Sequence, residues 1–315
     1  MTSFRILFRF LATALLLALS AFAPLRAAAD EPKSLTDYVS ADEPPLFDST
    51  TAAVDAFKKA LADNDFDALA KLLGFDPAKL KTSDGVMDTF DKVRAGASEK
   101  VIVEELADRE LLKIGNDLWP FPFPVVKVEK GKWAFDTYAG LEEIINRRVG
   151  ENEIEAIATM RAYVEAQRDY AAEDHDGDGV LEYAQKLSSS EGKTDGLYWP
   201  ASEDNGVSPA GGFADEAALD KAKKGEGYFG YRFRILTGQG NNVAGGAYDY
   251  VINGNMIAGF AAIARPVKYG ETGVRTFMVS HQGIVYEADL GPDTEKKADA
   301  IKLFNPNDSW EVTGD

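Results

Sequence analysis

The sequence EDHDGDG at residues 173–179 places four carboxylates within six residues. Dense oxygen ligands suit Ca²⁺, and an EF-hand loop takes them from positions 1, 3, 5, 7, 9 and 12. The three aspartates fall at positions 1, 3 and 5, and the last glycine falls at position 6, where the turn requires glycine. The next residues supply a carbonyl at position 7 and a carboxylate at position 9. The spacing therefore predicts a Ca²⁺ site whose ligands are Asp174, Asp176, Asp178, Val180 and Glu182.

This loop departs from the EF-hand pattern at its last ligand. Position 12 is Gln185, which is neutral and cannot supply the bidentate carboxylate of the full motif. We therefore expect an affinity no better than roughly 10⁻⁴ to 10⁻³ M, the range of extracellular calcium modules. The alternative is a solvated turn without metal, because Asp and Gly favour turns. A helix is expected before the loop, and the negative end of its dipole favours a cation there.

A second group of carboxylates offers a different chemistry. Residues 142–153 include four glutamates, from which two could act as acid and base in a glycan hydrolase. The alternative is structural, because Glu143 and Arg147 stand four residues apart and would pair along a helix face. The chain has no cysteine, and its two histidines, His175 and His281, stand in no triad or zinc pattern. Both histidines are expected at the surface.

Aromatic residues form a third candidate surface. Trp119 begins the segment WPFPF and Trp199 lies in YWP, and both segments have the composition of loops. If both tryptophans are exposed and coplanar, they predict a glycan-binding module. The alternative is that these rings are buried, which is the commoner place of large aromatic side chains.

The first 29 residues have the composition of an export signal. Arg5 and Arg9 precede an apolar run at residues 10–22, and three alanines at residues 27–29 form a cleavage site. The mature chain is expected to begin at Asp30 and to be periplasmic or secreted. The apolar run is too short for a comfortable membrane span, and no later segment is long enough, so the mature chain is expected to have none.

Charge narrows the classes of partner. The chain has 52 acidic and 34 basic side chains, for a net charge of −18. Removing the signal takes away three basic residues and no acidic one, so the charge becomes −21. Such a charge repels nucleic acid and anionic lipid and favours cations, so no nucleic-acid partner is expected. Without disulfides, the chain must rely on its hydrophobic cores.

The residues before the acidic stretch predict two parts. Residues 30–48 are polar and contain three prolines, which predicts an irregular lead-in. Residues 49–136 predict an N-terminal α+β lobe, in which two short helices precede strands. Its clearest hairpin joins residues 125–128 to 132–135 through the turn EKG. This succession resembles the small cone-shaped domains of the nuclear-transport-factor-two-like superfamily.

Residues 137–315 predict a second lobe of helix and antiparallel sheet. A helix over 137–149 is expected to end at Gly150, a longer helix covers 152–172 and a short one 181–187. Another helix is expected at 215–224. An antiparallel meander is then predicted from the strand patterns at residues 231–235, 248–252, 256–264, 275–280 and 284–286. The fold class is therefore α+β.

The second lobe resembles the globular part of type II secretion pseudopilins. The likeness rests on one long helix, an irregular segment and a terminal antiparallel meander. The resemblance implies a calcium site in the C-terminal region, as in the major class of pseudopilins. The chain departs from that family because its helix lacks the hydrophobic half that anchors and polymerises a pilin.

Five motifs resemble a whole family. They are AGLEEIINRRVGENE at 139–153, DGDGVLEYAQ at 176–185, DGLYWP at 195–200, GYRFRIL at 230–236 and FAAIARPVKYGETGVRTFMV at 260–279. In this order they resemble the bacterial exported proteins grouped as domain of unknown function 2950. The resemblance covers nearly all of the mature chain and implies α+β architecture and export, but no activity.

These observations favour a non-enzymatic protein of the cell envelope. We expect a structural or interaction protein with a Ca²⁺-stabilised loop, and an envelope protein or glycan as its partner. The alternatives are a hydrolase of envelope glycans, acting through residues 142–153, and a glycan-binding module.

Overall fold

The computed structural model describes residues 34–202 and 205–314. The expected signal and its cleavage site lie outside the described residues. Buried apolar side chains form two clusters: the N-terminal core within residues 38–141 and the C-terminal core within residues 156–304. Helices and antiparallel sheets contribute to both, so the predicted α+β class is confirmed. No helix in the described part is long and apolar enough to cross a membrane.

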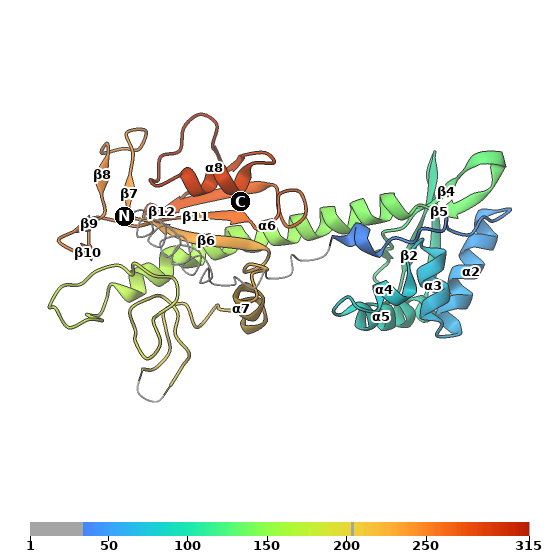
Figure 1. Ribbon diagram of the computed structural model, residues 1–315, viewed down its shortest axis with the longest axis horizontal. Helices are drawn as coiled ribbons and strands as arrows, with labels where there is room; N and C mark the ends of the chain where they lie inside the picture. The colour runs from blue at the N-terminus through green and yellow to red at the C-terminus, as the bar shows by residue number, and fades with distance from the viewer. Residues whose placement is uncertain (1–33, 203–204, 315) are drawn as a thin grey trace, which may run out of the picture. The chain divides into compact units, whose positions relative to one another are not determined.

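Helices pack against a small antiparallel sheet to form the N-terminal core (Figure 1). The helical segments are η1 (Leu35–Tyr38), α2 (Thr50–Ala62), α3 (Phe66–Leu72), α4 (Pro77–Leu80) and α5 (Val86–Glu99). The sheet has the order β1-β2-β4-β5, with β3 also paired to β2. The strands are β1 (Val101–Glu105), β2 (Arg109–Ile114), β3 (Trp119–Pro120), β4 (Val125–Lys127) and β5 (Trp133–Phe135), with the turn η2 (Glu129–Gly131) between the last two.

Local signals in the sequence explain α2. The Ser49 side chain accepts the Ala52 N–H at the start of α2, and Val54, Phe57 and Leu61 are buried at helical spacing. In contrast, η1 and α5 were not predicted. The N-terminal lead-in contains the buried Tyr38, and α5 is a largely polar helix that buries only Phe90 and Val93.

One continuous helix, α6 (Thr137–Tyr170), replaces the two predicted helices. The predicted break at Gly150 is wrong. A side chain at Gly150 would meet no atom within 4 Å, so this glycine serves no close approach. Glycine in a helix interior costs only about 1 kcal/mol relative to alanine. Packing on both sides outweighs that cost, because Leu141 is buried in the N-terminal core and Met160 in the C-terminal core.

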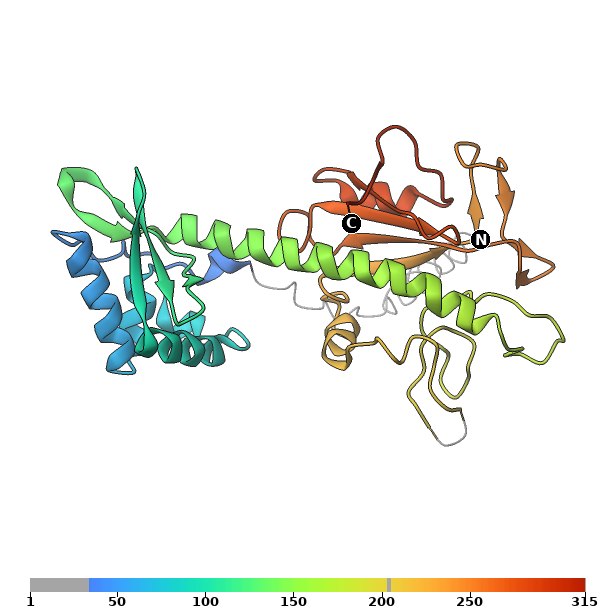
Figure 2. The same ribbon diagram turned by 180° about the vertical axis from the view of Figure 1, so that it is seen from behind.

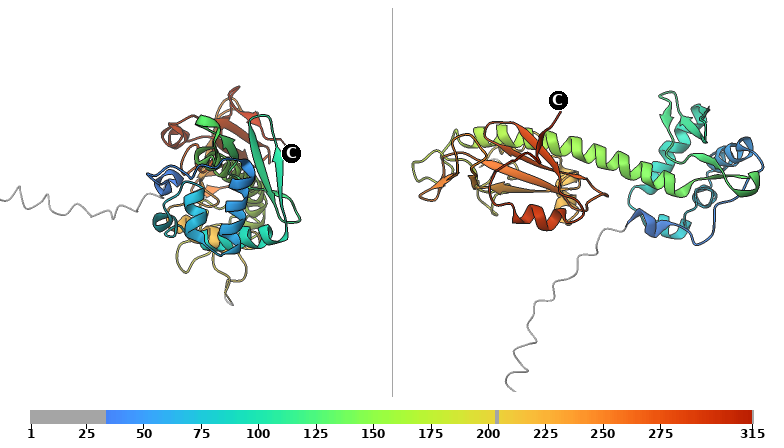
Figure 3. Two further views of the ribbon diagram at one scale, coloured as in Figure 1. Left: turned by 90° about the vertical axis from the view of Figure 1, so that its right-hand side faces the viewer. Right: turned by 90° about the horizontal axis from the view of Figure 1, so that it is seen from above.

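An antiparallel sheet in the order β14-β13-β12-β11-β6 forms the centre of the C-terminal core. Its strands are β6 (Tyr231–Leu236), β11 (Ala261–Pro266), β12 (Arg275–Ser280), β13 (Val285–Asp289) and β14 (Glu311–Val312). The helix α6 lies along one face of this sheet (Figure 2), and α8 (Thr294–Ala300) covers the other (Figure 3, right). All six residues of β11 are buried, as a strand covered on both faces requires.

Short elements complete the second lobe. They are α7 (Glu216–Lys223) and the strand pairs β7 (Gly238–Gln239) with β8 (Tyr248–Asp249) and β9 (Val251–Ile252) with β10 (Asn255–Met256). The helix predicted over 181–187 is wrong, because this segment is not helical. Its backbone is bound by distant partners instead: Tyr183 N–H donates to the Met256 carbonyl at 2.9 Å, and Ala184 N–H donates to the Gln167 side chain at 2.8 Å.

Candidate functional site

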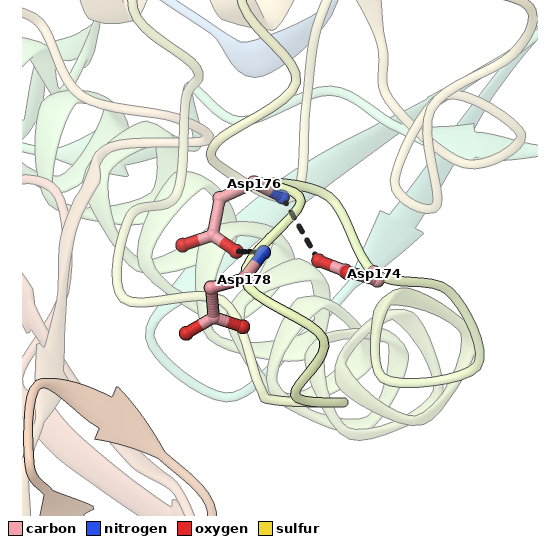
Figure 4. Close-up of side chains that lie close together, drawn as sticks. All are labelled: Asp174, Asp176 and Asp178. Carbon is pink, nitrogen blue, oxygen red and sulfur yellow. Dashed lines mark hydrogen bonds between the residues drawn. The ribbon is translucent and has the colours of Figure 1, made fainter.

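The acidic loop, residues 173–182, brings three carboxylates together immediately after the end of α6. Asp174, Asp176 and Asp178 each offer a carboxylate oxygen, and these oxygens lie within 4.8 Å of one another (Figure 4). Two oxygens that share a Ca²⁺ at about 2.3–2.6 Å cannot lie more than about 5 Å apart. The spacing of the three carboxylates therefore fits one Ca²⁺.

Backbone N–H groups fold the loop around its first aspartate. Asp174 accepts hydrogen bonds from Gly177 N–H at 2.8 Å and from Gly179 N–H at 2.9 Å. Gly179 has a φ of +84°, the left-handed conformation that glycine adopts without strain. These two hydrogen bonds lower the pKa of Asp174, because N–H donors favour the charged carboxylate, and the bond from Gly179 contributes more than the bond from Gly177. Asp174 is therefore ionised at neutral pH.

The loop is also bound to the hairpin β9–β10. Asp178 accepts a hydrogen bond from the Asn255 side chain at 2.8 Å, and Glu182 accepts one from Met256 N–H at 2.9 Å. Gln185 donates to the Gly254 carbonyl at 2.6 Å. These contacts hold both ends of residues 178–185 against a hairpin whose residues lie 69 to 77 positions further along the chain.

One of the five predicted ligands, Glu182, has another role in this structure. The Glu182 carboxylate accepts from the hairpin, and it does not belong to the group of three aspartates. Val180 was predicted to bind through its carbonyl, and its N–H donates to Asp178 at 2.8 Å. Gln185, at the last position of the motif, also donates to Glu182 at 3.3 Å. The geometry thus concentrates the candidate site on the three aspartates.

The two histidines are packed, contrary to the prediction that both lie at the surface. His175 stacks on Tyr170 with ring centroids 4.0 Å apart, and its Nε2 bonds the Tyr170 carbonyl at 3.1 Å. Burial raises the pKa of the Tyr170 hydroxyl to about 12, and the nearby carboxylate of Glu182 adds to this shift. Through this stacking and hydrogen bond with Tyr170, His175 connects the acidic loop to the last turn of α6.

His281 has a different environment, between the rings of Tyr250 and Phe260. Its Nδ1 is buried and has no hydrogen-bond partner among the residues that the structure describes. Burial lowers the pKa of His281, because removing water disfavours the charged imidazolium. His281 is therefore neutral at pH 7 and belongs to an aromatic cluster.

The glutamates of residues 142–153 are mainly occupied by structural contacts. Glu143 forms an ion pair with Arg147 at 2.7 Å, as the structural alternative expects. Glu153 accepts hydrogen bonds from the N–H groups of Val274 and Arg275 at 2.8 and 2.9 Å, which attaches α6 to the start of β12. The other two glutamates are exposed. This arrangement gives no support to an acid and base pair for hydrolysis.

The two tryptophans considered for glycan binding differ in exposure. Trp119 is 43% exposed, whereas Trp199 is only 6% exposed. The Trp199 indole N–H donates to the Asn205 carbonyl at 3.2 Å, and its ring contacts His175. Trp199 therefore belongs to the packing behind the acidic loop. The condition that both rings be exposed is not met.

Comparison with known proteins gives one match. No curated protein and no solved structure matches the chain. A family model described as "Protein of unknown function (DUF2950)" matches residues 45–313, which is most of the chain. This range includes α6, the acidic loop, the C-terminal core and all of the N-terminal core except Tyr38, and the five motifs lie within it. The chain therefore belongs to the DUF2950 family of proteins of unknown function.

Proposed function

We propose that this protein is exported from a bacterial cell and acts in the envelope as a structural or interaction protein, without catalysis. In this proposal a Ca²⁺ ion bound by Asp174, Asp176 and Asp178 stabilises the acidic loop. The observation that carries the proposal is the spacing of the three carboxylate oxygens, all within 4.8 Å of one another.

Electrostatics supports a cation at this position. The three aspartates are exposed like charges, and they follow the C-terminal end of α6, where the helix dipole is negative. The pKa of Asp174 is lowered, so protonation does not relieve the repulsion at neutral pH. A divalent cation would replace this repulsion by attraction. A Ca²⁺ ion suits the site because it accepts carboxylates, carbonyls and water in variable numbers.

The contacts of the loop indicate what the ion would stabilise. Asp178 is both a member of the aspartate group and the acceptor for Asn255 on the hairpin β9–β10. An ion that fixes Asp178 would therefore also fix the contact between the loop and this hairpin. His175 and Trp199 pack behind the loop. Calcium would thus make one surface of the C-terminal lobe rigid, as a surface for an envelope partner.

Two substitutions that each remove one negative charge test the proposal. Asp176→Asn removes one ligand, while Glu173→Gln removes a carboxylate from the same stretch but outside the aspartate group. In millimolar calcium, Asp176→Asn should lower the melting temperature relative to Glu173→Gln. In chelator the two variants should have the same melting temperature, because the Ca²⁺ ion that binds only the native state is no longer present to stabilise it.

Thermal melting of both variants and the wild type, with calcium and with chelator, makes this comparison. A site occupied at about 100 times its Kd adds about 2.7 kcal/mol to stability, so even weak binding is measurable. The proposal is contradicted if Asp176→Asn and Glu173→Gln lose the same stability in calcium. With magnesium in place of calcium, the wild type should melt at the same temperature as in chelator.

A further inference from the structure

A cavity of about 490 Å³ opens into the N-terminal core. It is bounded by η1, α3, α5, the segment 119–123 and α6. Protein interiors are close-packed, and voids larger than a water molecule are few. Small-molecule sites, in contrast, have volumes of about 300–1,000 Å³. The volume of this cavity is that of a ligand site.

The walls of the cavity are apolar and rich in aromatic rings. Five phenylalanines line it, and each is no more than 8% exposed. Their rings contact one another: Phe66 with Phe90 at 5.4 Å, and Phe75 and Phe121 with Phe123 at 5.6 and 5.5 Å. These contacts fix the walls, so the cavity is formed before any ligand enters. Such a surface suits an aliphatic or aromatic body.

Two arginines of α6 line the same cavity, and they differ in their partners. Arg147 is paired with Glu143 at 2.7 Å and lies over the Trp119 ring at 5.4 Å. Arg148 is half-buried, and within the described residues it has neither an ion pair nor a hydrogen bond. Neither Asp84 nor Glu151, which line the same cavity, forms an ion pair with Arg148, so its guanidinium is open to the carboxylate of a ligand.

A second free polar group lies in the wall. The Tyr38 side chain is 7% exposed and lines the cavity, and its hydroxyl has no hydrogen-bond partner among the described residues. The hydroxyl oxygen itself is not fully buried, so it is accessible to water or to a ligand. A few polar groups in an otherwise apolar cavity are the usual means of orienting a bound ligand.

We propose that this cavity binds a small amphiphile of the fatty-acid type. The aliphatic chain occupies the space between the phenylalanines, and the single carboxylate pairs with Arg148. Asp84 and Glu151 also line the cavity, and their negative charges disfavour a doubly charged head such as a phosphate monoester. The site is independent of the acidic loop, and its ligand does not depend on calcium.

A second cavity, of about 510 Å³ in the C-terminal lobe, carries no such inference. Arg232, the one cationic side chain in its lining, already has a partner within the protein. The Tyr163 and Tyr231 hydroxyls donate to the carbonyls of Ala261 and Arg275, and Arg232 donates to the Gly225 carbonyl. Its described lining therefore offers no unpaired cation to an anionic head.

The test measures binding of dodecanoate to the purified protein after bound lipid has been extracted, by isothermal titration calorimetry. Arg148→Met should weaken dodecanoate binding about tenfold or more, because it removes a charge-assisted hydrogen bond. Arg94→Met should leave binding unchanged, since Arg94 lies on α5, is paired with Asp91 and does not line the cavity. Dodecanol, which lacks the charge, should bind the wild type and Arg148→Met equally.

A second variant tests the cavity itself. Val93 lines the cavity from α5, and Val93→Trp should abolish dodecanoate binding by filling the space. The retained fold of each variant is checked by circular dichroism. Absence of dodecanoate binding to the delipidated wild type overturns the proposal. Equal binding of dodecanoate to the wild type and to Arg148→Met overturns it as well.

Discussion

Replacing Gln167 by leucine is expected to lower the free energy of unfolding by about 3 kcal/mol. Gln167 is completely buried, and its amide bonds both backbone groups of Ala184: the N–H donates to Oε1 and the carbonyl accepts from Nε2, each at 2.8 Å. Leucine fills a similar volume but bonds neither group. Two buried polar groups would lose their partners, at about 1–3 kcal/mol each.

Urea denaturation of the variant measures this loss, and hydrogen exchange at the Ala184 amide locates it. The matched control is Gln185→Leu, because Gln185 is exposed and its partners can turn to water. That control should cost less than about 0.5 kcal/mol. Equal losses for the two variants would show that the Gln167 bonds do not hold the segment after the acidic loop to α6.

Two glycines in α6 should respond to alanine with opposite signs. A Cβ at Gly140 would lie 1.9 Å from a ring carbon of Phe123, whereas a Cβ at Gly150 would meet nothing within 4 Å. Alanine gains about 1 kcal/mol of helix propensity at either position. At Gly140 the clash costs about 3 kcal/mol, near the upper end for overpacked cores, because the Phe123 ring is itself packed.

We therefore expect Gly140→Ala to lose about 2 kcal/mol and Gly150→Ala to gain about 1 kcal/mol. Urea denaturation of the two variants gives the difference directly, and each variant serves as the control of the other. A stabilising Gly140→Ala would mean that Phe123 moves aside freely. In that case the walls of the N-terminal cavity would not be fixed.

Elements with strong local signals could be predicted from the sequence. The spacing of Val54, Phe57 and Leu61 predicted α2, and the turn EKG predicted the hairpin of β4 and β5. The proximity of the three aspartates also follows from their spacing in one turn-rich loop. In these cases the physical cause lies within a few residues of the feature.

Features with distant partners could not be predicted in this way. The segment 181–187 has apolar residues at helical spacing, but its backbone bonds Met256 and Gln167, so it is not helical. Gly150 was expected to end a helix, yet packing in both cores continues α6 through it. The surface prediction for His175 failed because its partners, Tyr170 and Trp199, come together only in the fold.

The N-terminal cavity illustrates the same limit. Its lining extends from Leu35 to Glu151, over five helices and an irregular segment, and no local motif unites these residues. The Arg147–Glu143 pair was predicted from its spacing, whereas the unpaired state of Arg148 was not. Which of two neighbouring arginines lacks a partner depends on side chains that only the fold brings near.

Terbium luminescence tests the central claim, a calcium ion at the acidic loop, most directly. Tb³⁺ replaces Ca²⁺ at oxygen sites and emits when an excited aromatic ring lies close by. Tyr170 and Trp199 both contact His175, within the loop. We predict Tb³⁺ emission when the aromatic residues are excited. Calcium should abolish this emission by displacing Tb³⁺, whereas magnesium should not. Asp176→Asn should weaken the emission strongly, while Glu173→Gln should retain it. Emission that is absent, or that the two variants share equally, would contradict a metal site at Asp174, Asp176 and Asp178.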